Sequence, residues 1–329
     1  MPMRRIGKTL SVALAALACS APLLLRAEKS IFAVIPNEVR NLSVSGLPSR
    51  QSRRDSSARN VPRNDSASCI SANCSLRAAT QSISTRQDAA KPCGIVTVAA
   101  ASDLAYAMDE IAVKFQTATG CTVRTSMGSS GNFLSQIENG APFDVFLSAD
   151  IAYPKQLESE GLAAPGSTVL YATGKIVLWT RNDSRVDIAK GFSSLRDPAV
   201  RKIAIANPQH APYGRAAEEA LRRAGVYDAV KDRLVLGENI SQAAEFVESG
   251  NAEAGIVALS LALSPAMKDK GRAWSIPQNL YAPIQQGAVI PRSAPNAQAA
   301  RRFLDYFQLP ATAQLLERYG FSLPGKEKP

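Results

Sequence analysis

Short apolar runs alternate with amphipathic segments through residues 94–329, and this alternation limits the fold more than any other feature. Residues 95–100 are apolar and strand-like, and residues 104–119 then place apolar side chains at helical spacing before Gly120. Further strand-like runs occupy residues 122–126, 144–149, 203–206, 233–236 and 254–260. Strands that alternate with helices form mainly parallel sheets covered by helices. The sequence therefore predicts an α/β fold.

Two further apolar runs indicate how this region is divided. Residues 175–179 form a strand that leads into a second lobe, and residues 284–290 form one that returns to the first. We expect lobe I to comprise residues 93–178 plus 285–329, and lobe II residues 179–284. A chain that crosses twice between lobes makes a hinged cleft, with ligands at the carboxyl ends of the strands.

Three hydroxyl-rich turns follow predicted strands: Ala-Ala-Ala-Ser-Asp at 99–103, Gly-Ser-Ser-Gly at 128–131 and Asn-Pro-Gln-His-Ala-Pro-Tyr-Gly at 207–214. Such turns present backbone N–H groups and hydroxyls at helix N-termini, where a small anion binds without a cationic side chain. No nucleophile–base pair or metal-ligand cluster accompanies them. His210 is the only histidine, and we expect it to be a solvated turn residue, since it lacks Cys or His partners for a metal. The turns predict a binding site, not an enzyme.

The first 27 residues have the pattern of a signal peptide. Arg4, Arg5 and Lys8 precede a mostly apolar stretch over residues 9–25, as in secretory signals. The cleavage site is not evident from the sequence. Lipidation at Cys19 and an uncleaved membrane-anchoring helix are the alternatives. We expect an exported, periplasmic protein.

Residues 28–92 are rich in Ser, Arg, Asn and Pro, and we expect them to be disordered because they bury too little apolar surface.

Positive charge is concentrated near the N-terminus. Residues 1–90 hold 13 Lys and Arg against five Asp and Glu, so most of the net charge of +10 lies there. The remainder is nearly neutral and has no basic stripe with aromatic residues, which argues against nucleic-acid binding.

Two of the five cysteines, Cys93 and Cys121, stand at the starts of the predicted strands 94–100 and 122–126. If these strands are neighbours in one parallel sheet, the two Cα atoms approach disulfide distance in an oxidising compartment. Free thiols at both positions are the alternative.

The order of the motifs is what identifies a family. Residues 94–329 resemble the periplasmic molybdate-binding proteins of ABC transporters. The resemblance depends on the three turns together with Gly-Ala-Pro-Phe-Asp-Val-Phe-Leu-Ser-Ala-Asp at 140–150, Gly-Glu-Asn-Ile-Ser-Gln at 237–242, Gly-Ile-Val-Ala-Leu-Ser at 255–260 and Arg-Tyr-Gly-Phe at 318–321. It implies a two-lobed periplasmic binding protein fold, similar to type II, with the ligand in the hinge cleft.

The resemblance also implies which residues bind the oxyanion. Ser102 and Ser130 match the family's two serine contacts, and Tyr213 and Ile240 match its contacts from the second lobe. Ser129 lies beside Ser130 and is a further candidate contact. Asp103 lies beside Ser102, and we expect its carboxylate to point away from the anion and leave only its backbone N–H to help.

The sequence departs from one branch of the family at a single ligand position. Some members have a further tyrosine where this chain has Ala258 or Leu259. The phenol of Tyr213 is the candidate replacement, and packing of this side chain between the lobes is the alternative.

The function implied is tight binding of molybdate or tungstate by a monomer, without a cofactor, and delivery to an ABC-importer permease. Binding of another oxyanion, sulfate or phosphate, is the first alternative. A hydrolase on the same fold that uses Ser130 is the second, although the chain lacks a Gly-X-Ser-X-Gly elbow and a convincing histidine base.

Overall fold

The computed structural model describes residues 94–325. The predicted signal peptide 1–27, the segment 28–92 and Cys93 lie outside these residues. No helix within residues 94–325 combines the length and the apolar character that crossing a bilayer requires.

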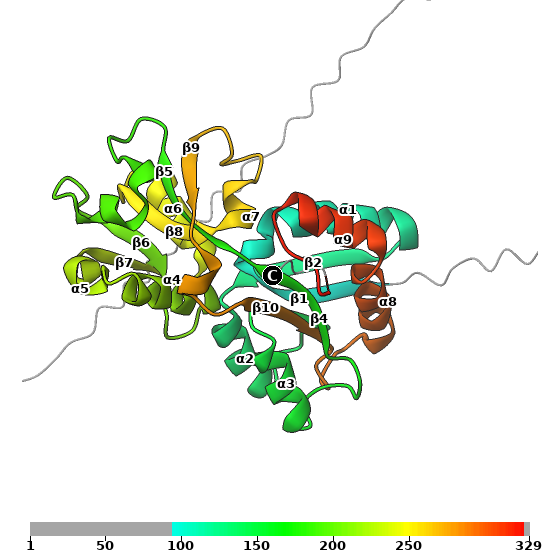
Figure 1. The fold of residues 1–329 in the computed structure, drawn as a ribbon. Helices are drawn as coiled ribbons and strands as arrows, with labels where there is room; N and C mark the ends of the chain where they lie inside the picture. Colours follow the sequence, from blue (N-terminus) through cyan, green and yellow to red (C-terminus); the bar gives the residue numbers. More distant parts are fainter. Residues whose placement is uncertain (1–93, 326–329) are drawn as a thin grey trace, which may run out of the picture. The chain divides into compact units, whose positions relative to one another are not determined.

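Two five-stranded sheets form the framework of the described region (Figure 1). The order in the first is β2 (Thr122–Gly128), β1 (Ile95–Ala101), β3 (Val145–Ser148), β10 (Ile284–Val289) and β4 (Val169–Gly174). The order in the second is β7 (Leu234–Gly237), β6 (Ile203–Ala206), β8 (Ala254–Ala258), β5 (Ile176–Arg181) and β9 (Gly271–Ser275). In each sheet one strand, β10 or β5, runs antiparallel to both of its neighbours, while the other pairings are parallel. The predicted fold class, two lobes with mainly parallel sheets, is confirmed.

The two antiparallel strands are also the strands that follow a crossing between sheets. The chain leaves the first sheet after β4 and enters the second at β5, so the first crossing lies at Lys175. It returns after β9 and re-enters the first sheet at β10. The sequence-based boundary between residues 178 and 179 therefore falls inside β5, because the apolar run 175–179 belongs wholly to the second sheet apart from its first residue.

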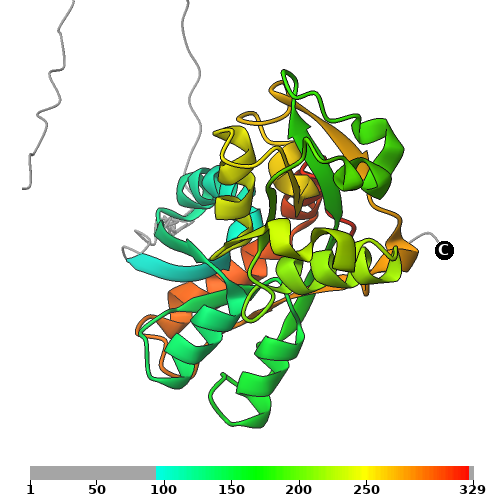
Figure 2. The same ribbon diagram turned by 90° about the vertical axis from the view of Figure 1, so that its left-hand side faces the viewer.

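Helices cover both faces of the first sheet. One face carries α1 (Ala105–Thr119), α8 (Ala297–Phe307) and α9 (Pro310–Arg318), and the other carries α2 (Ser130–Glu138) and α3 (Ala152–Ser159). Side chains along β1 alternate between these layers: Val98 packs with the first group and Ala99 with the second, as the pleat of a strand requires. Figures 1 and 2 both show the orange helix α8 near the cyan strand β1, with which it is in contact. The C-terminal helices thus complete the lobe that the first strand begins.

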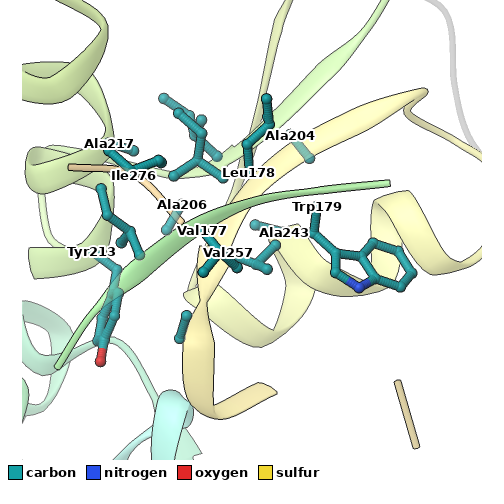
Figure 3. Close-up of a cluster of buried hydrophobic side chains, with 14 of the residues drawn as sticks. Val177, Leu178, Trp179, Ala204, Ala206, Tyr213, Ala217, Ala243, Val257 and Ile276 are labelled. Carbon is teal, nitrogen blue, oxygen red and sulfur yellow. The ribbon is translucent and has the colours of Figure 1, made fainter. Parts of the chain in front are cut away.

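The second sheet has its own core. Its helices and helical turns are η2 (Ile188–Arg196), α4 (Pro212–Arg223), α5 (Tyr227–Val230), η3 (Lys231–Arg233), α6 (Ile240–Glu248), α7 (Leu259–Ala262) and η4 (Gln278–Leu280). Figure 3 shows part of this core, which includes Val177, Val257 and Trp179; the Trp179 ring extends to one side of the other labelled side chains. Tyr213 packs its ring against this cluster, and its hydroxyl group lies at the end of the ring that leaves the cluster (Figure 3).

Strands β1 and β2 are parallel neighbours, with Ile95 opposite Thr122, as the disulfide prediction assumed. Cys121 is buried at the start of β2 and is disulfide-bonded. It is the only cysteine among residues 94–325, so its partner lies outside them. Pairing of Cys121 with Cys93 stays a prediction.

Candidate functional site

A small cavity lies where the two lobes meet. Its volume is about 190 Å³, including the solvent at its mouth. The residues that line it are Ala101, Ser102, Asp103, Gly128, Ser129, Ser130, Ala149, Ala211, Pro212, Tyr213 and Ile240. They come from the carboxyl ends of β1, β2 and β3 in the first lobe and from turns after β6 and β7 in the second. All six residues that the sequence motifs predict as oxyanion contacts line this one cavity.

Helix N-termini from both lobes face this cavity. Ser130 is the first residue of α2 and Ile240 the first of α6, while Tyr213 follows Pro212 at the start of α4. Ser102 opens the short 3-10 turn η1 (Ser102–Leu104), which continues into α1. The first N–H groups of a helix have no acceptor within the helix, and the helix dipole places partial positive charge there. The arrangement therefore provides neutral hydrogen-bond donors for a small anion.

Ser130 is the clearest side-chain donor. It is fully buried, and its Oγ accepts a hydrogen bond of 2.9 Å from the backbone N–H of Ala149. No acceptor for its hydroxyl proton exists in the part of the chain that the structure describes. This fixed oxygen with a free proton can donate to an anion in the cavity.

Ser102 joins the two lobes. Its hydroxyl donates to Asn239 Oδ1 at 3.1 Å and accepts from the N–H of Ser241 at 3.3 Å. The Ser241 hydroxyl in turn donates to the carbonyl oxygen of Ser102 at 2.9 Å. Asn239 is also the N-cap of α6, since its Oδ1 accepts from the N–H of Gln242. Ser102 therefore fixes the N-terminus of α6, and with it Ile240, against the first lobe.

A second set of contacts closes the cleft at the serine turn. The Nδ1 atom of His210 lies 2.9 Å from Ser129 Oγ, and the N–H of Gly131 donates to the carbonyl oxygen of His210 at 2.9 Å. The expectation that His210 is a solvated turn residue is wrong, because its turn lies against the other lobe and the residue is half-buried. A Cβ on Gly131 would stand 2.7 Å from that carbonyl oxygen, so closure requires glycine here.

An ion pair adds to this closure beyond the cavity. Arg215, on α4, contacts Asp150 at 2.5 Å and donates to Tyr153 Oη at 2.8 Å. Asp150 and Tyr153 belong to the first lobe, and both partners of the ion pair are partly exposed. The structure thus describes the two lobes in a closed arrangement.

Asp103 lies inside a buried polar network that the sequence did not reveal. Tyr213 donates its hydroxyl to Asp103 Oδ2 at 2.9 Å, and Gln286 Nε2 lies 2.5 Å from the same oxygen. Tyr171 donates to Gln286 Oε1 at 2.8 Å. Ser260 donates to the carbonyl oxygen of Asp103 at 2.7 Å. These contacts connect β4, β10, α4 and α7 through Asp103.

Burial controls the protonation of this network. Loss of solvation raises the pKa of Asp103 from 3.8 to about 6, although the hydrogen bonds from Gln286 and Tyr213 lower it. Burial and the nearby Asp103 carboxyl raise the pKa of Tyr171 and Tyr213 well above 10, so both phenols stay neutral.

Tyr213 is not placed as the sequence alone implies. Asp103 lines the cavity and is 1 % exposed, and its Oδ2 bonds to Tyr213 and Gln286. The phenol of Tyr213 was a candidate donor to the anion, but its proton is committed to Asp103. Tyr213 thus offers the cavity its backbone N–H at the start of α4.

Several residues at this site escaped sequence reasoning, namely Tyr171, Asn239, Ser241, Ser260 and Gln286. Asn239 and Ser241 lie inside the Gly-Glu-Asn-Ile-Ser-Gln motif, so a capping pattern beside Ile240 was available as a signal. Tyr171 and Gln286 lie mid-strand in β4 and β10, and only the sheet order brings them to Asp103.

The charge of the cavity lining is unusual for an anion site. Asp103 is its one ionisable side chain apart from the neutral Tyr213, and no Lys, Arg or His lines it. Within residues 94–325 no group of three or more His, Cys, Asp or Glu residues is arranged to hold a metal ion. Such a lining can hydrogen-bond an anion through neutral donors.

Comparison with known proteins agrees with this description. Residues 96–322 match the family model described as bacterial extracellular solute-binding protein. The chain is 42 % identical over 228 residues to proteins called molybdate-binding protein ModA from Rhodobacter capsulatus and from Azotobacter vinelandii. Each match covers 69 % of this chain, with 88 % and 90 % of the respective relatives.

A solved structure gives the same result in three dimensions. The periplasmic molybdate-binding protein of Azotobacter vinelandii aligns with a TM-score of 0.66 and 37 % sequence identity, over 70 % of this chain and 99 % of that one. The resemblance inferred from the motifs is confirmed. The chain therefore belongs to the bacterial extracellular solute-binding proteins, in the group whose members include the ModA molybdate-binding proteins.

Proposed function

We propose that this chain binds molybdate or tungstate in the cleft between its lobes and delivers the anion to a membrane permease of an ABC importer. The observation that carries the proposal is the convergence of Ser102, Ser130, Tyr213 and Ile240, each at a helix or 3-10 turn N-terminus, on one cavity without a cationic side chain. Donors from both lobes meet there, so the anion is held only when the lobes close.

Hydrogen bonds from neutral donors are sufficient for tight binding. Each hydrogen bond to a charged group contributes roughly 1.5–3 kcal/mol. The hydroxyl of Ser130 and the N–H groups of the turns supply about six donors, which must first offset the dehydration of the anion. The remainder supports a dissociation constant between micromolar and nanomolar, or about −8 to −12 kcal/mol.

The chemistry of the donors favours a fully deprotonated tetrahedral oxyanion, because each oxygen meets a donor. Cavity size then separates large oxyanions from small ones, and molybdate and tungstate are nearly equal in size. The names of the relatives support molybdate as the ligand of this chain. Sulfate and phosphate remain the competing ligands, since helix N-termini serve them equally well.

The contact between Ser129 and His210 is the one observation that favours a hydrolase. A serine nucleophile needs a histidine base that is itself oriented by a third group. His210 uses Nδ1 for Ser129, and no carboxylate bonds to its other ring nitrogen among the residues that the structure describes. Ser130, the nucleophile considered from the sequence, contacts Ala149 instead. We therefore propose a binding protein that works without catalysis or a cofactor.

Transport requires that the closed, loaded form differ from the open one. The lobes meet through Ser102, Ser129 and Gly131 in the first and through Asn239, Ser241 and His210 in the second. Closure around the anion would present a surface that a permease recognises. We propose that the protein acts as a periplasmic monomer, in keeping with the periplasmic relative of known structure.

Isothermal titration calorimetry on the purified chain tests the proposal, with molybdate, tungstate, sulfate and phosphate titrated in parallel. We expect tight binding of molybdate and tungstate and much weaker binding of the other two. Tight binding of sulfate or phosphate without a response to molybdate would overturn the assignment. Labelling of Ser129 by a fluorophosphonate probe would instead support the hydrolase.

A further inference from the structure

Asp103 is the residue of the cavity lining that anion binding does not explain. It is 1 % exposed and lines the same cavity as Ser102, Ser130 and Tyr213. An ionised carboxylate at this place would repel a bound dianion, and the lining contains no cation to compensate. A neutral carboxyl group in the same place would not.

The hydrogen bonds determine which oxygen of Asp103 can carry a proton. Tyr171 donates to Gln286 Oε1, which orients the Gln286 amide so that Nε2 faces Asp103 Oδ2. Tyr213 donates to the same Oδ2. Oδ2 therefore accepts from two donors and has no place for a proton of its own.

The other carboxyl oxygen has no such partner. Asp103 Oδ1 is buried and has no hydrogen-bond partner among the described residues. A buried carboxylate oxygen without a donor is costly, whereas a protonated oxygen in an anion cavity becomes useful as soon as an acceptor arrives. An oxygen of the anion is such an acceptor.

We propose that Asp103 binds a proton at Oδ1 when the anion enters and donates it in a hydrogen bond to an anion oxygen, so that anion binding and proton uptake are coupled. This inference rests on the proposed function, because it concerns the same cavity and the same class of ligand. The proton comes from solvent and stays on the carboxyl group. It is not transferred to the anion, whose oxygens stay unprotonated. The site residues hydrogen-bond the oxygens of the anion and do not coordinate its metal atom.

The groups around Asp103 leave it as the residue that titrates. Tyr213 from α4 and Tyr171 from β4 are neutral phenols, and β10 contributes the uncharged Gln286. The elements α6 and α7, which pack on η1, present Ser241 and Ser260. His210 bonds to Ser129 and not to Asp103. Burial places the pKa of Asp103 at about 6 in the closed protein before the anion binds.

Linkage fixes the form of the pH dependence. Above the pKa of the free site, Asp103 must be protonated for binding, so the association constant falls about tenfold for each unit of rising pH. Below pH 6 the carboxyl group is already protonated, and the dependence disappears. With Asn at position 103 an uncharged amide replaces the carboxyl group, and the slope should vanish.

Calorimetry with molybdate at pH 7.5, in buffers with different enthalpies of ionisation, counts the protons taken up. We expect close to one proton per anion for the unmodified chain and an affinity that falls about tenfold between pH 7 and 8. Asp103→Asn should bind without proton uptake and with a flat pH profile. Asp109→Asn is the matched control, because it removes an exposed carboxylate from the adjacent helix α1, and it should keep the slope.

The outcomes separate this inference from the proposed function. Binding without proton uptake and without pH dependence in the unmodified chain overturns the inference and leaves the proposed function standing. The same holds if Asp103→Asn keeps the slope of the unmodified chain. Failure of the unmodified chain to bind any of the four oxyanions at pH 6 overturns the proposed function. The proton count is measured on the unmodified chain, so an absence of proton uptake overturns the inference even if Asp103→Asn does not fold.

Discussion

A methyl group at Gly131 should keep the cleft open without harming either lobe. Gly131 is the second residue of α2, and its N–H donates to the carbonyl oxygen of His210 across the cleft. In Gly131→Ala the new Cβ would lie 2.7 Å from this oxygen and 3.0 Å from the Cα atom of His210. Both are backbone atoms of the other lobe, so no side-chain rotation relieves the clash.

The expected magnitude follows from the contacts that this clash disrupts. Opening the cleft at this point breaks the Gly131–His210 bond and the Ser129–His210 bond. At about 1 kcal/mol each, their loss weakens anion binding by about 2 kcal/mol, or about 30-fold. The free energy of unfolding should instead increase, since Ala is favoured over Gly in a helix by roughly 0.5–1 kcal/mol.

Calorimetry and thermal unfolding of Gly131→Ala measure the two effects separately, and small-angle scattering with saturating molybdate reports on closure. The neighbouring variant Asn132→Ala is the control. It removes a long 3.3 Å contact with Glu238 without adding bulk, and should change affinity less than threefold, or by well under 1 kcal/mol. Unchanged affinity and full closure in Gly131→Ala would refute the role of this contact.

Four further changes follow from the same structure. Ser130→Ala should weaken molybdate binding by about 1.5–3 kcal/mol, because a hydroxyl donor is lost. It should also reduce the free energy of unfolding by about 1–3 kcal/mol, because the buried N–H of Ala149 loses its acceptor. Calorimetry measures the first effect and denaturant titration the second, and an unchanged affinity would show that Ser130 does not contact the anion. Tyr213→Phe should cost less affinity than Ser130→Ala, since its hydroxyl is bonded to Asp103, and a larger loss would mean that the phenol contacts the anion. The unfolding free energy of the anion-free protein should fall by up to about 3 kcal/mol between about pH 4 and pH 8, because the raised pKa of Asp103 gives a stabilisation that is full below the unfolded value and is lost as pH rises through 6. Denaturant titration across this range measures the fall, and an equal fall in Asp103→Asn would assign it to another group. Reduction of the Cys121 disulfide should lower unfolding stability by about 2–4 kcal/mol, and peptide mapping should find Cys93 as the partner; a different partner would disprove the predicted pairing.

Local sequence patterns were enough to predict most of the strands that position the site. The apolar runs at 95–100, 122–126 and 203–206 correspond to β1, β2 and β6 within one or two residues. These strands are apolar and buried, or they lead directly into a turn with a characteristic sequence. Their composition and the turn residues that follow them therefore both indicate where they lie. The same turns contain the residues that line the cavity, which is why the motif order led to the right family.

The sequence was less informative where tertiary structure decides. Strand β9 (Gly271–Ser275) was not foreseen, because its pattern is partly exposed and it is held as an edge strand by β5. Strand β4 was also missed, yet it supplies Tyr171 to the Asp103 network. Gln286 stands 183 residues from Asp103 in the chain, and no local pattern connects them. The solvated role expected for His210 failed for the same reason, since its partner Ser129 lies in the other lobe.

A crystal structure of the tungstate complex tests the central claim most directly, because anomalous scattering locates the metal atom without reference to any assumption about the site. We expect one strong peak inside the cavity, with oxygens within hydrogen-bond distance of Ser130 Oγ and of the N–H groups of Tyr213 and Ile240. A peak elsewhere, in a protein that calorimetry shows to bind tungstate tightly, would contradict it.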